Sequence, residues 1–376
     1  EFDNDRTWRL TSETGEMFSF DVVINAMGNQ HTAAYPNVEG MESFSGDSWH
    51  GTRWNHEVNL HGKRVAIIGS AASAIQIVPE LAKQAAHLTV LQRTPNWIMA
   101  RGRKFYSKKL IALFNWLPGL VNVYRRIQAY MMSFTVEGVT LGHKRMDQFE
   151  KIAKDYLHEV IKDPDLRETL TPNSRYGCKR GLVSDDFYPA LLRDNVDLIA
   201  EGLKSVRPQG ITTASGKDID VDVIIYCTGY HILDYDRIHV SGLAGKSLAE
   251  EMAKSPTAYM GIAATDFPNY FFAAGPNGLA INASYFANVE RNTKTIVGLL
   301  KQKQQVGIQA LVVKPDICNA YNQNLALQFS QFSWGASNCN SYYRTATGHA
   351  PFLFPGSFKE YNRLHNQCSI DVFDAV

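Results

Sequence analysis

A glycine and an arginine twenty-four residues apart, Gly69 and Arg93, have the spacing of a dinucleotide-binding turn and its distal recognition residue. Small residues follow the glycine and would let the backbone approach a pyrophosphate: Ser70, Ala71 and Ser73. The amides at the start of the next helix would donate to that anion. Arg93 and Thr94 stand where an NADH site carries an acidic residue, and the guanidinium can form a fork to a 2′-phosphate. These residues predict an NADPH site.

The elements that must position this turn form a βαβ unit. An all-apolar run at 65–68 precedes Gly69, a helical stretch follows it, and a second apolar run at 88–91 precedes Arg93. The turn departs from G-x-G-x-x-G, because Ala71 and Ala74 replace its second and third glycines. Ala74 is an accepted alternative, whereas the Ala71 methyl group is expected to weaken pyrophosphate binding. A plain βαβ unit with small residues for close packing stays open as the alternative.

Further motifs surround this unit. The pattern F-x-G-x-x-x-H-x-x-x-W is matched by Phe44, Gly46, His50 and Trp54. Other segments share one order along the chain: 26–28 (AMG), 92–97 (QRTPNW), 176–180 (YGCKR), 227–230 (CTGY), 275–277 (GPN), 339–343 (CNSYY) and 354–356 (FPG). Together they closely resemble the Baeyer–Villiger monooxygenases, from about residue 8 to residue 361.

The resemblance implies an α/β flavoprotein with two dinucleotide-binding domains. Residues 1–50 would be a remnant of the FAD domain and the motif-bearing linker, and residues 231–376 the C-terminal part of that domain. Residues 55–100 and 178–230 would form a Rossmann-like NADPH domain, interrupted by a helical insert at 101–176. The implied enzyme uses NADPH, FAD and molecular oxygen, and inserts one oxygen atom into a ketone through a peroxyflavin to give an ester or lactone.

The resemblance also assigns roles to residues. Arg180 matches the active-site arginine, whose guanidinium stays charged at any working pH. Lys179 matches the lysine that joins Arg93 on the 2′-phosphate. His50 is expected to act in the linker between domains and Trp54 to pack there. The remaining expected cofactor contacts are Thr228, Gly229, Gly275, Pro276 and Asn277.

Composition limits the classes of function. The net charge is +1 and charged residues make up 20% of the 376 residues, so neither a nucleic-acid partner nor disorder is indicated. Two or three domains are expected at this length. The five cysteines contain no C-x-x-C pair, which favours reduced thiols and a cytoplasmic location. The histidines show no metal-ligand spacing, so no metal site is expected.

The apolar stretch 105–132 needs a separate interpretation. Two residues, Pro118 and Gly119, interrupt it, and it contains no uncharged run of 18 residues. A pair of amphipathic helices is the favoured prediction, followed by another helix at 146–160. Peripheral membrane contact through the apolar, basic segment is the alternative.

A first G-x-G-x-x-G for the FAD pyrophosphate does not occur before Gly69. We therefore expect a fragment of a longer protein that lacks the N-terminal part of its FAD domain. Two other functions stay open. One is a related flavin monooxygenase that oxidises nitrogen or sulfur, whose motif typically ends in an aromatic residue other than Trp54. The other is a non-catalytic remnant that binds NADP.

Overall fold

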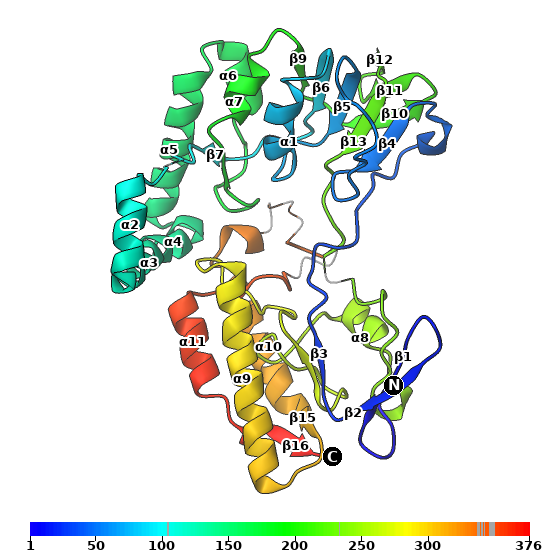
Figure 1. Ribbon diagram of the computed structural model, residues 1–376, viewed down its shortest axis with the longest axis vertical. Coiled ribbons are helices and arrows are strands. Elements are labelled where there is room, and N and C mark those ends of the chain that lie inside the picture. Colours follow the sequence, from blue (N-terminus) through cyan, green and yellow to red (C-terminus); the bar gives the residue numbers. More distant parts are fainter. Residues whose placement is uncertain (104, 233, 337–338, 340, 342, 346–349) are drawn as a thin grey trace. The chain divides into compact units, whose positions relative to one another are not determined.

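The chain divides into two compact units in the computed structural model (Figure 1). The structure describes residues 1–103, 105–232, 234–336, 339, 341, 343–345 and 350–376, so positions 340 and 342 of the expected motif 339–343 lie outside the described residues. Unit 1 comprises Glu1–Asn29, Lys109–Arg145 and Ile232–Val376. Unit 2 comprises Gln30–Lys108 and Met146–His231.

A five-stranded parallel sheet forms the centre of unit 2. Its strands, in spatial order, are β4 (Asp47–His50), β13 (Val223–Tyr226), β5 (Arg64–Ile68), β6 (His87–Leu91) and β9 (Val196–Ile199). The three central strands are apolar almost throughout because both faces of the sheet are covered. Alternate residues belong to different cores: Val65 and Ile67 face one, while Ala66 and Ile68 face the other.

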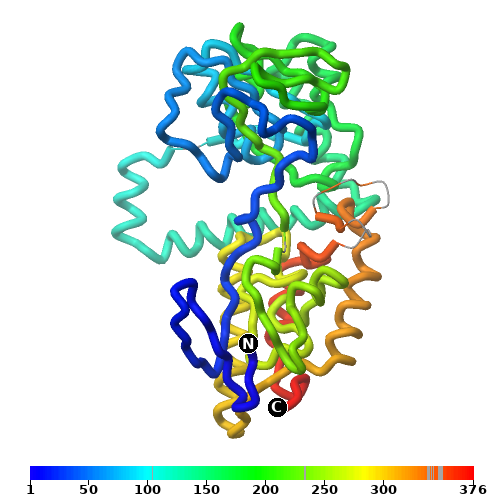
Figure 2. The backbone as a smooth tube through the Cα atoms, turned by 90° about the vertical axis from the view of Figure 1, so that its right-hand side faces the viewer, coloured from blue at the N-terminus to red at the C-terminus, as the bar shows by residue number. Residues whose placement is uncertain are grey.

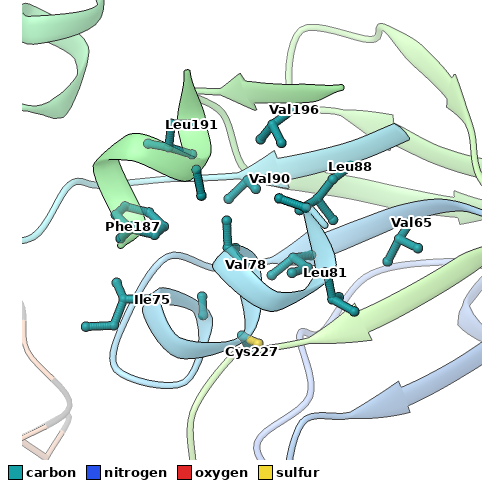
Figure 3. Packing of buried hydrophobic residues seen from close by; sticks show 14 of the residues in the cluster. Val65, Ile75, Val78, Leu81, Leu88, Val90, Phe187, Leu191, Val196 and Cys227 are labelled. Atoms are coloured by element: carbon teal, nitrogen blue, oxygen red, sulfur yellow. The ribbon is translucent and has the colours of Figure 1, made fainter. Parts of the chain in front are cut away.

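Different elements cover the two faces of this sheet. Helices α1 (Ala74–Leu81) and α7 (Phe187–Leu191) lie on one face, where Val78 and Leu81 pack against Leu88 (Figure 3). A small antiparallel sheet covers the other face through Val206 and Ile211; its strands are β10 (Leu203–Arg207), β11 (Gly210–Thr213) and β12 (Asp218–Asp220). The βαβ unit expected around Gly69 is thus present, with its strands one residue longer at the start.

The edge strand β4 lies within the motif segment that the sequence assigns to a linker. It pairs with β13, and the structure groups residues 30–50 with unit 2 and not with unit 1. The expected segment 1–50 is therefore divided after Asn29. Sequence patterning does not reveal β4 because an edge strand can expose polar residues, and Asp47 and Ser48 are exposed here.

Unit 1 contains a short parallel pair, β3 (Val23–Asn25) and β14 (Tyr270–Phe272). Helix α9 (Tyr285–Val306) packs against α11 (Phe358–Asn366). Two antiparallel pairs and two more helices also belong to this unit: β1 (Trp8–Thr11) with β2 (Met17–Phe20), β15 (Leu311–Val313) with β16 (Phe373–Ala375), α8 (Leu248–Lys254) and α10 (Pro315–Phe329).

The expected insert 101–176 is helical, but the structure divides it: residues 109–145 belong to unit 1, whereas 101–108 and 146–176 belong to unit 2. Its helices are α2 (Lys108–Trp116), α3 (Pro118–Ser133), α4 (Thr135–Val139), α5 (Lys144–Val160) and α6 (Pro164–Leu170). The later part joins unit 2 because Leu157 of α5 and Leu170 of α6 enter the core of that unit. In contrast, α2 and α3 bury no residue. Within the described chain, no helix has the length and apolar character needed to span a bilayer.

The cysteines fall into two groups. Cys227, Cys318 and Cys368 are free, and burial raises the pKa of the Cys227 thiol to about 12, so it stays protonated at neutral pH. Cys178 and Cys339 are disulfide-bonded, so the expectation of five reduced thiols is wrong for these two.

Candidate functional site

The turn after β5 is shaped around Gly69. This residue has φ 109°, and its amide donates to the Leu91 carbonyl at 2.9 Å. A Cβ atom at this position would lie 2.6 Å from the carbonyl oxygen of Cys227. Any side chain would therefore clash with the end of the neighbouring strand β13, as well as being strained at this φ. Glycine is required here for both reasons.

At the start of α1, the amides of Ile75, Gln76 and Ile77 donate to the carbonyls of Ala71 and Ser73, so donors for an anion would come from the amides that precede Ile75. Ser73 precedes the helix, but its side chain makes no capping hydrogen bond. The first amides of a helix lack intrahelical partners, and the helix dipole makes this end attractive to anions. The side-chain amide of Asn96 stabilises the turn by donating a hydrogen bond to the Ser70 carbonyl at 3.2 Å. Ala71 is exposed in the same turn, so its methyl group faces solvent and not the core.

Two cations lie together at the end of β6. Arg93 is exposed, and Lys179 donates from Nζ to the hydroxyl of Thr94. Burial, and then the charge of Arg93, lower the pKa of Lys179. A lysine whose pKa is lowered by burial and by a neighbouring cation would be stabilised in its charged form by a bound anion. The structure thus brings Lys179 to Arg93 and Thr94, although 85 positions separate Thr94 and Lys179 in the sequence.

Arg180 follows this cluster directly. Its side chain is exposed, and within the part of the chain that the structure describes it has no carboxylate partner. A guanidinium that is neither buried nor paired can turn toward a bound group. The structure therefore leaves its expected role as a prediction.

Thr228 and Gly229 follow β13, the third strand whose end contributes residues to the site. The Thr228 hydroxyl donates to the Ala34 carbonyl at 2.5 Å, and the Gly229 carbonyl accepts from the Ala34 amide at 3.0 Å. The two chain segments of unit 2 that begin at Gln30 and end at His231 are thereby joined side by side. Thr228 therefore has a structural partner, and its contact with a cofactor stays a prediction.

Phe44 and Gly46 of the motif F-x-G-x-x-x-H-x-x-x-W are packing residues. Phe44 is half-buried against the core beneath the small antiparallel sheet. A Cβ on Gly46 would lie 2.3 Å from the Asp222 carbonyl oxygen and 2.8 Å from the Phe44 ring. At the other end of the motif, Trp54 packs edge to face on Trp49, with ring centroids 5.7 Å apart. The motif therefore describes how β4 and the following turn attach to the sheet.

His50 ends β4 and is buried between the rings of Tyr35 and Tyr230, at centroid distances of 5.5 and 5.8 Å. Its Nδ1 accepts from the Thr52 amide at 3.3 Å, which places the proton of the neutral ring on Nε2. Burial lowers the pKa of His50, although the Gly229 backbone offsets part of that effect. His50 is thus a buried, neutral residue near pH 7, and its expected role in the linker between domains stays a prediction.

A cavity of about 220 Å³ lies in unit 1, where β3 and β14 end. The Ala26-Met27-Gly28 turn and Asn25 form one side of it. Its other lining residues are Asn29, Asp234, Tyr235, Phe272, Ala273, Ala274, Tyr285, Phe286 and Val289. The sequence motif indicates the first turn, but residues such as Tyr285 and Phe286 carry no signal that separates them from an ordinary helix start.

Gly275, Pro276 and Asn277 follow this lining and are buried. The Asn277 side chain donates to the carbonyls of Ala350 and Leu353 at 3.0 and 2.7 Å. Its amide group is therefore used to attach the segment around residue 350. The expected contact of these three residues with a cofactor stays a prediction, and any such contact would have to use the backbone of this loop.

Two buried residues that the sequence did not single out hold this loop from α9 and α11. Asn292 donates to the carbonyls of Ala273 and Gly278 at 2.9 and 3.2 Å, and accepts from the Tyr361 hydroxyl at 2.7 Å. Both side chains are fully buried. An asparagine on the apolar face of an expected helix was the available signal, because a buried amide needs partners.

The parallel sheet, its glycine turn and the paired cations define a dinucleotide-binding α/β protein. Gly69 and Thr228 follow the adjacent parallel strands β5 and β13, so they lie at the carboxyl ends of the strands, the usual ligand position in such folds.

Comparisons with known proteins identify the family. The family model described as "Flavin-binding monooxygenase-like" matches residues 4–241. A Baeyer–Villiger monooxygenase from Pseudomonas aeruginosa is 34% identical over 96% of this chain and 69% of its own. A second, from Streptomyces coelicolor, is 34% identical over 95% of this chain and 69% of its own.

Solved structures show the same fold. A crystal structure of OTEMO in complex with FAD and NADP has a TM-score of 0.87 at 23% identity, covering 100% of this chain and 79% of that one. Cyclohexanone monooxygenase in its closed form also has a TM-score of 0.87, at 22% identity, covering 100% of this chain and 78% of that one. The chain therefore belongs to the flavin-binding monooxygenase-like family and, within it, to the Baeyer–Villiger monooxygenases, as its motifs predicted.

Proposed function

We propose that this chain belongs to an NADPH- and FAD-dependent monooxygenase that converts a ketone into an ester or lactone. Ketone, O₂, NADPH and a proton give the ester, water and NADP⁺. One oxygen atom enters between the carbonyl carbon and its neighbour, and the other leaves as water. The observation that carries the proposal is the cluster of Arg93, Thr94 and Lys179 beside the Gly69 turn in a chain of this family.

The residues of unit 2 fit a phosphorylated dinucleotide. Gly69 permits the tight turn at the end of β5, because a Cβ there would lie 2.6 Å from the Cys227 carbonyl oxygen. The backbone amides of the turn, before Ile75, would donate to a pyrophosphate at the start of α1. Arg93 can offer a fork to the 2′-phosphate, while Lys179, held by Thr94, adds a second positive charge. No acidic side chain stands at 93 or 94 to favour an unphosphorylated ribose.

The residues of unit 1 fit part of a flavin nucleotide. The cavity of about 220 Å³ is smaller than a typical site for a whole cofactor, so it would hold only a portion of FAD. Its lining is mostly apolar with a few polar groups such as Asn25, as in cofactor sites generally. When bound, the flavin supplies the redox chemistry by accepting a hydride from the nicotinamide and activating oxygen.

Arg180 is proposed as the catalytic cation. Negative charge develops on the reacting oxygen atoms and then on the ketone oxygen, and a fixed positive charge stabilises that change. The exposed guanidinium of Arg180 is free to approach from its position beside Lys179. The neighbouring cations hold the nucleotide, which leaves Arg180 for the chemistry.

Two measurements test the proposal. Incubating the full chain with FAD, NADPH and a panel of cyclic ketones and sulfides distinguishes ester formation from sulfur oxidation. In an active preparation, Arg180→Ala should lower ester formation by at least about 10²–10³, the typical cost of removing one oxyanion donor. NADPH consumption should continue and yield hydrogen peroxide, and Arg180→Lys should restore little activity because an ammonium lacks the fork. Near-parental ester formation by the alanine variant would show that Arg180 is structural.

A further inference from the structure

Helices α2 and α3 present an apolar surface that the described chain does not cover. Neither helix buries a residue. Trp116 is 77% exposed, Val123 53% and Ile127 52%. The sequence favours a packed pair of amphipathic helices here, and the helices are present, but their apolar side chains face solvent.

The exposed side chains of α3 form one continuous face. Leu120, Val123, Ile127 and Tyr130 follow one another at i, i+3, i+7 and i+10, the spacing of a single helix face. All four are exposed. Arg125 lies on the opposite face, so the helix has an apolar side and a basic side.

The charge of this region has one sign. From residue 101 to residue 136 the sequence contains seven lysines and arginines and no aspartate or glutamate. Basic amphipathic helices with aromatic residues on the apolar side bind at the boundary between lipid head groups and acyl chains. Tryptophan and tyrosine are enriched at that boundary, and Trp116 and Tyr130 are exposed here.

We propose that the α2–α3 hairpin docks on an anionic lipid surface, with the apolar face of α3 in the interface and the basic residues near the head groups. A second copy fits less well, because a symmetric contact would bring the same uncompensated cations together. Spanning is excluded for these helices, since α3 has only 16 residues and carries Arg125 and Arg126 at its centre. Phe114 of α2 packs against Tyr124 of α3, with ring centroids 6.0 Å apart, so the two helices dock together as a hairpin.

The test is sedimentation of the full chain with vesicles of phosphatidylcholine, alone or mixed with phosphatidylglycerol. Binding should require the anionic lipid. Because each basic residue near such a surface contributes about fivefold, Arg125→Gln with Arg126→Gln should weaken binding about 30-fold. Val123→Asp with Ile127→Asp should abolish it, since both side chains would enter the apolar layer.

A matched control and a spectroscopic signal distinguish docking through α2 and α3 from nonspecific adsorption of the protein to vesicles. Leu327 of α10 is 75% exposed, and Leu327→Asp should leave vesicle binding unchanged. Trp116 should shift to shorter emission wavelengths on binding and be quenched by brominated lipid, whereas the other five tryptophans are buried or half-buried. The proposal is overturned if no vesicle binds the chain or if both vesicle types bind it equally. It is also overturned if the α3 variants change the molar mass by light scattering, which would indicate self-association.

Discussion

Replacing Arg93 and Lys179 tests how the chain separates NADPH from NADH. The two nucleotides differ only in the 2′-phosphate, so NADH serves as an internal control for every other contact. Lys179 is held by the Thr94 hydroxyl, and its lowered pKa reflects burial and the neighbouring Arg93. A dianion placed between the two cations would relieve their repulsion.

The expected magnitude follows from one lost contact at a time. A hydrogen bond to a charged group contributes about 1.5–3 kcal/mol, which corresponds to about 13- to 160-fold in affinity. Arg93→Ala and Lys179→Ala should each weaken NADP⁺ binding by a factor in this range. Neighbouring residues are not additive in general, so the double variant measures their coupling. It should bind NADP⁺ and NAD⁺ about equally.

Calorimetric titration of each variant with NADP⁺ and NAD⁺ provides the measurement. Arg193→Ala is a matched control, because Arg193 is an exposed arginine of unit 2 that precedes β9 and so lies at the opposite, amino ends of the strands. Its NADP⁺ affinity should equal that of the parent chain. Equal losses for NADP⁺ and NAD⁺ in Arg93→Ala, or an unchanged preference, would refute the assignment.

Three further outcomes are expected. Ala71→Gly should tighten NADP⁺ binding by removing an exposed methyl group from the turn, and unchanged affinity would mean that the turn already accommodates the pyrophosphate. Asn292→Ala should lower the free energy of unfolding by about 2–4 kcal/mol in urea titrations, because buried partners lose their hydrogen bonds; if its effect simply adds to that of Tyr361→Phe, the two do not share one network. Because the pKa of Lys179 is lowered, NADP⁺ affinity should decline with rising pH earlier than for an ordinary lysine, while Lys179→Arg stays flat.

The sequence predicts the βαβ unit because its pattern is local and strong. Residues 65–68 are apolar on both faces of a buried strand, and the small residues after them permit one kind of turn. No pattern in the sequence near Arg93 or near Lys179 predicts that the two side chains lie close together. Only the resemblance to a family anticipates it, since spacing along the chain says nothing about two segments joined by a helical insert.

Other features depend on the fold and were missed or placed differently. The polar edge strand β4 resembles a loop in sequence, and α2 and α3 have the pattern of packed helices although their apolar sides are exposed. Asn277 lies in a motif that suggests a cofactor contact, yet its side chain is used to attach the segment at 350–353. In each case the local pattern of residue types is clear from the sequence. What these residues contact depends on distant parts of the chain, so the pattern alone does not predict it.

Nucleotide selectivity in this chain rests on the register of its central sheet. Ile68 pairs with both Leu91 and Tyr226, so the residues that follow these strands emerge at one level. A one-residue slip of β6 would move Arg93 by about 3.3 Å and turn it to the other face of the sheet. Such a slip would also exchange the residues that face the two cores. Each side chain would then lie against neighbours whose size and shape do not match it. The buried alternation of β5 and β6 therefore fixes where the recognition arginine lies relative to the glycine turn.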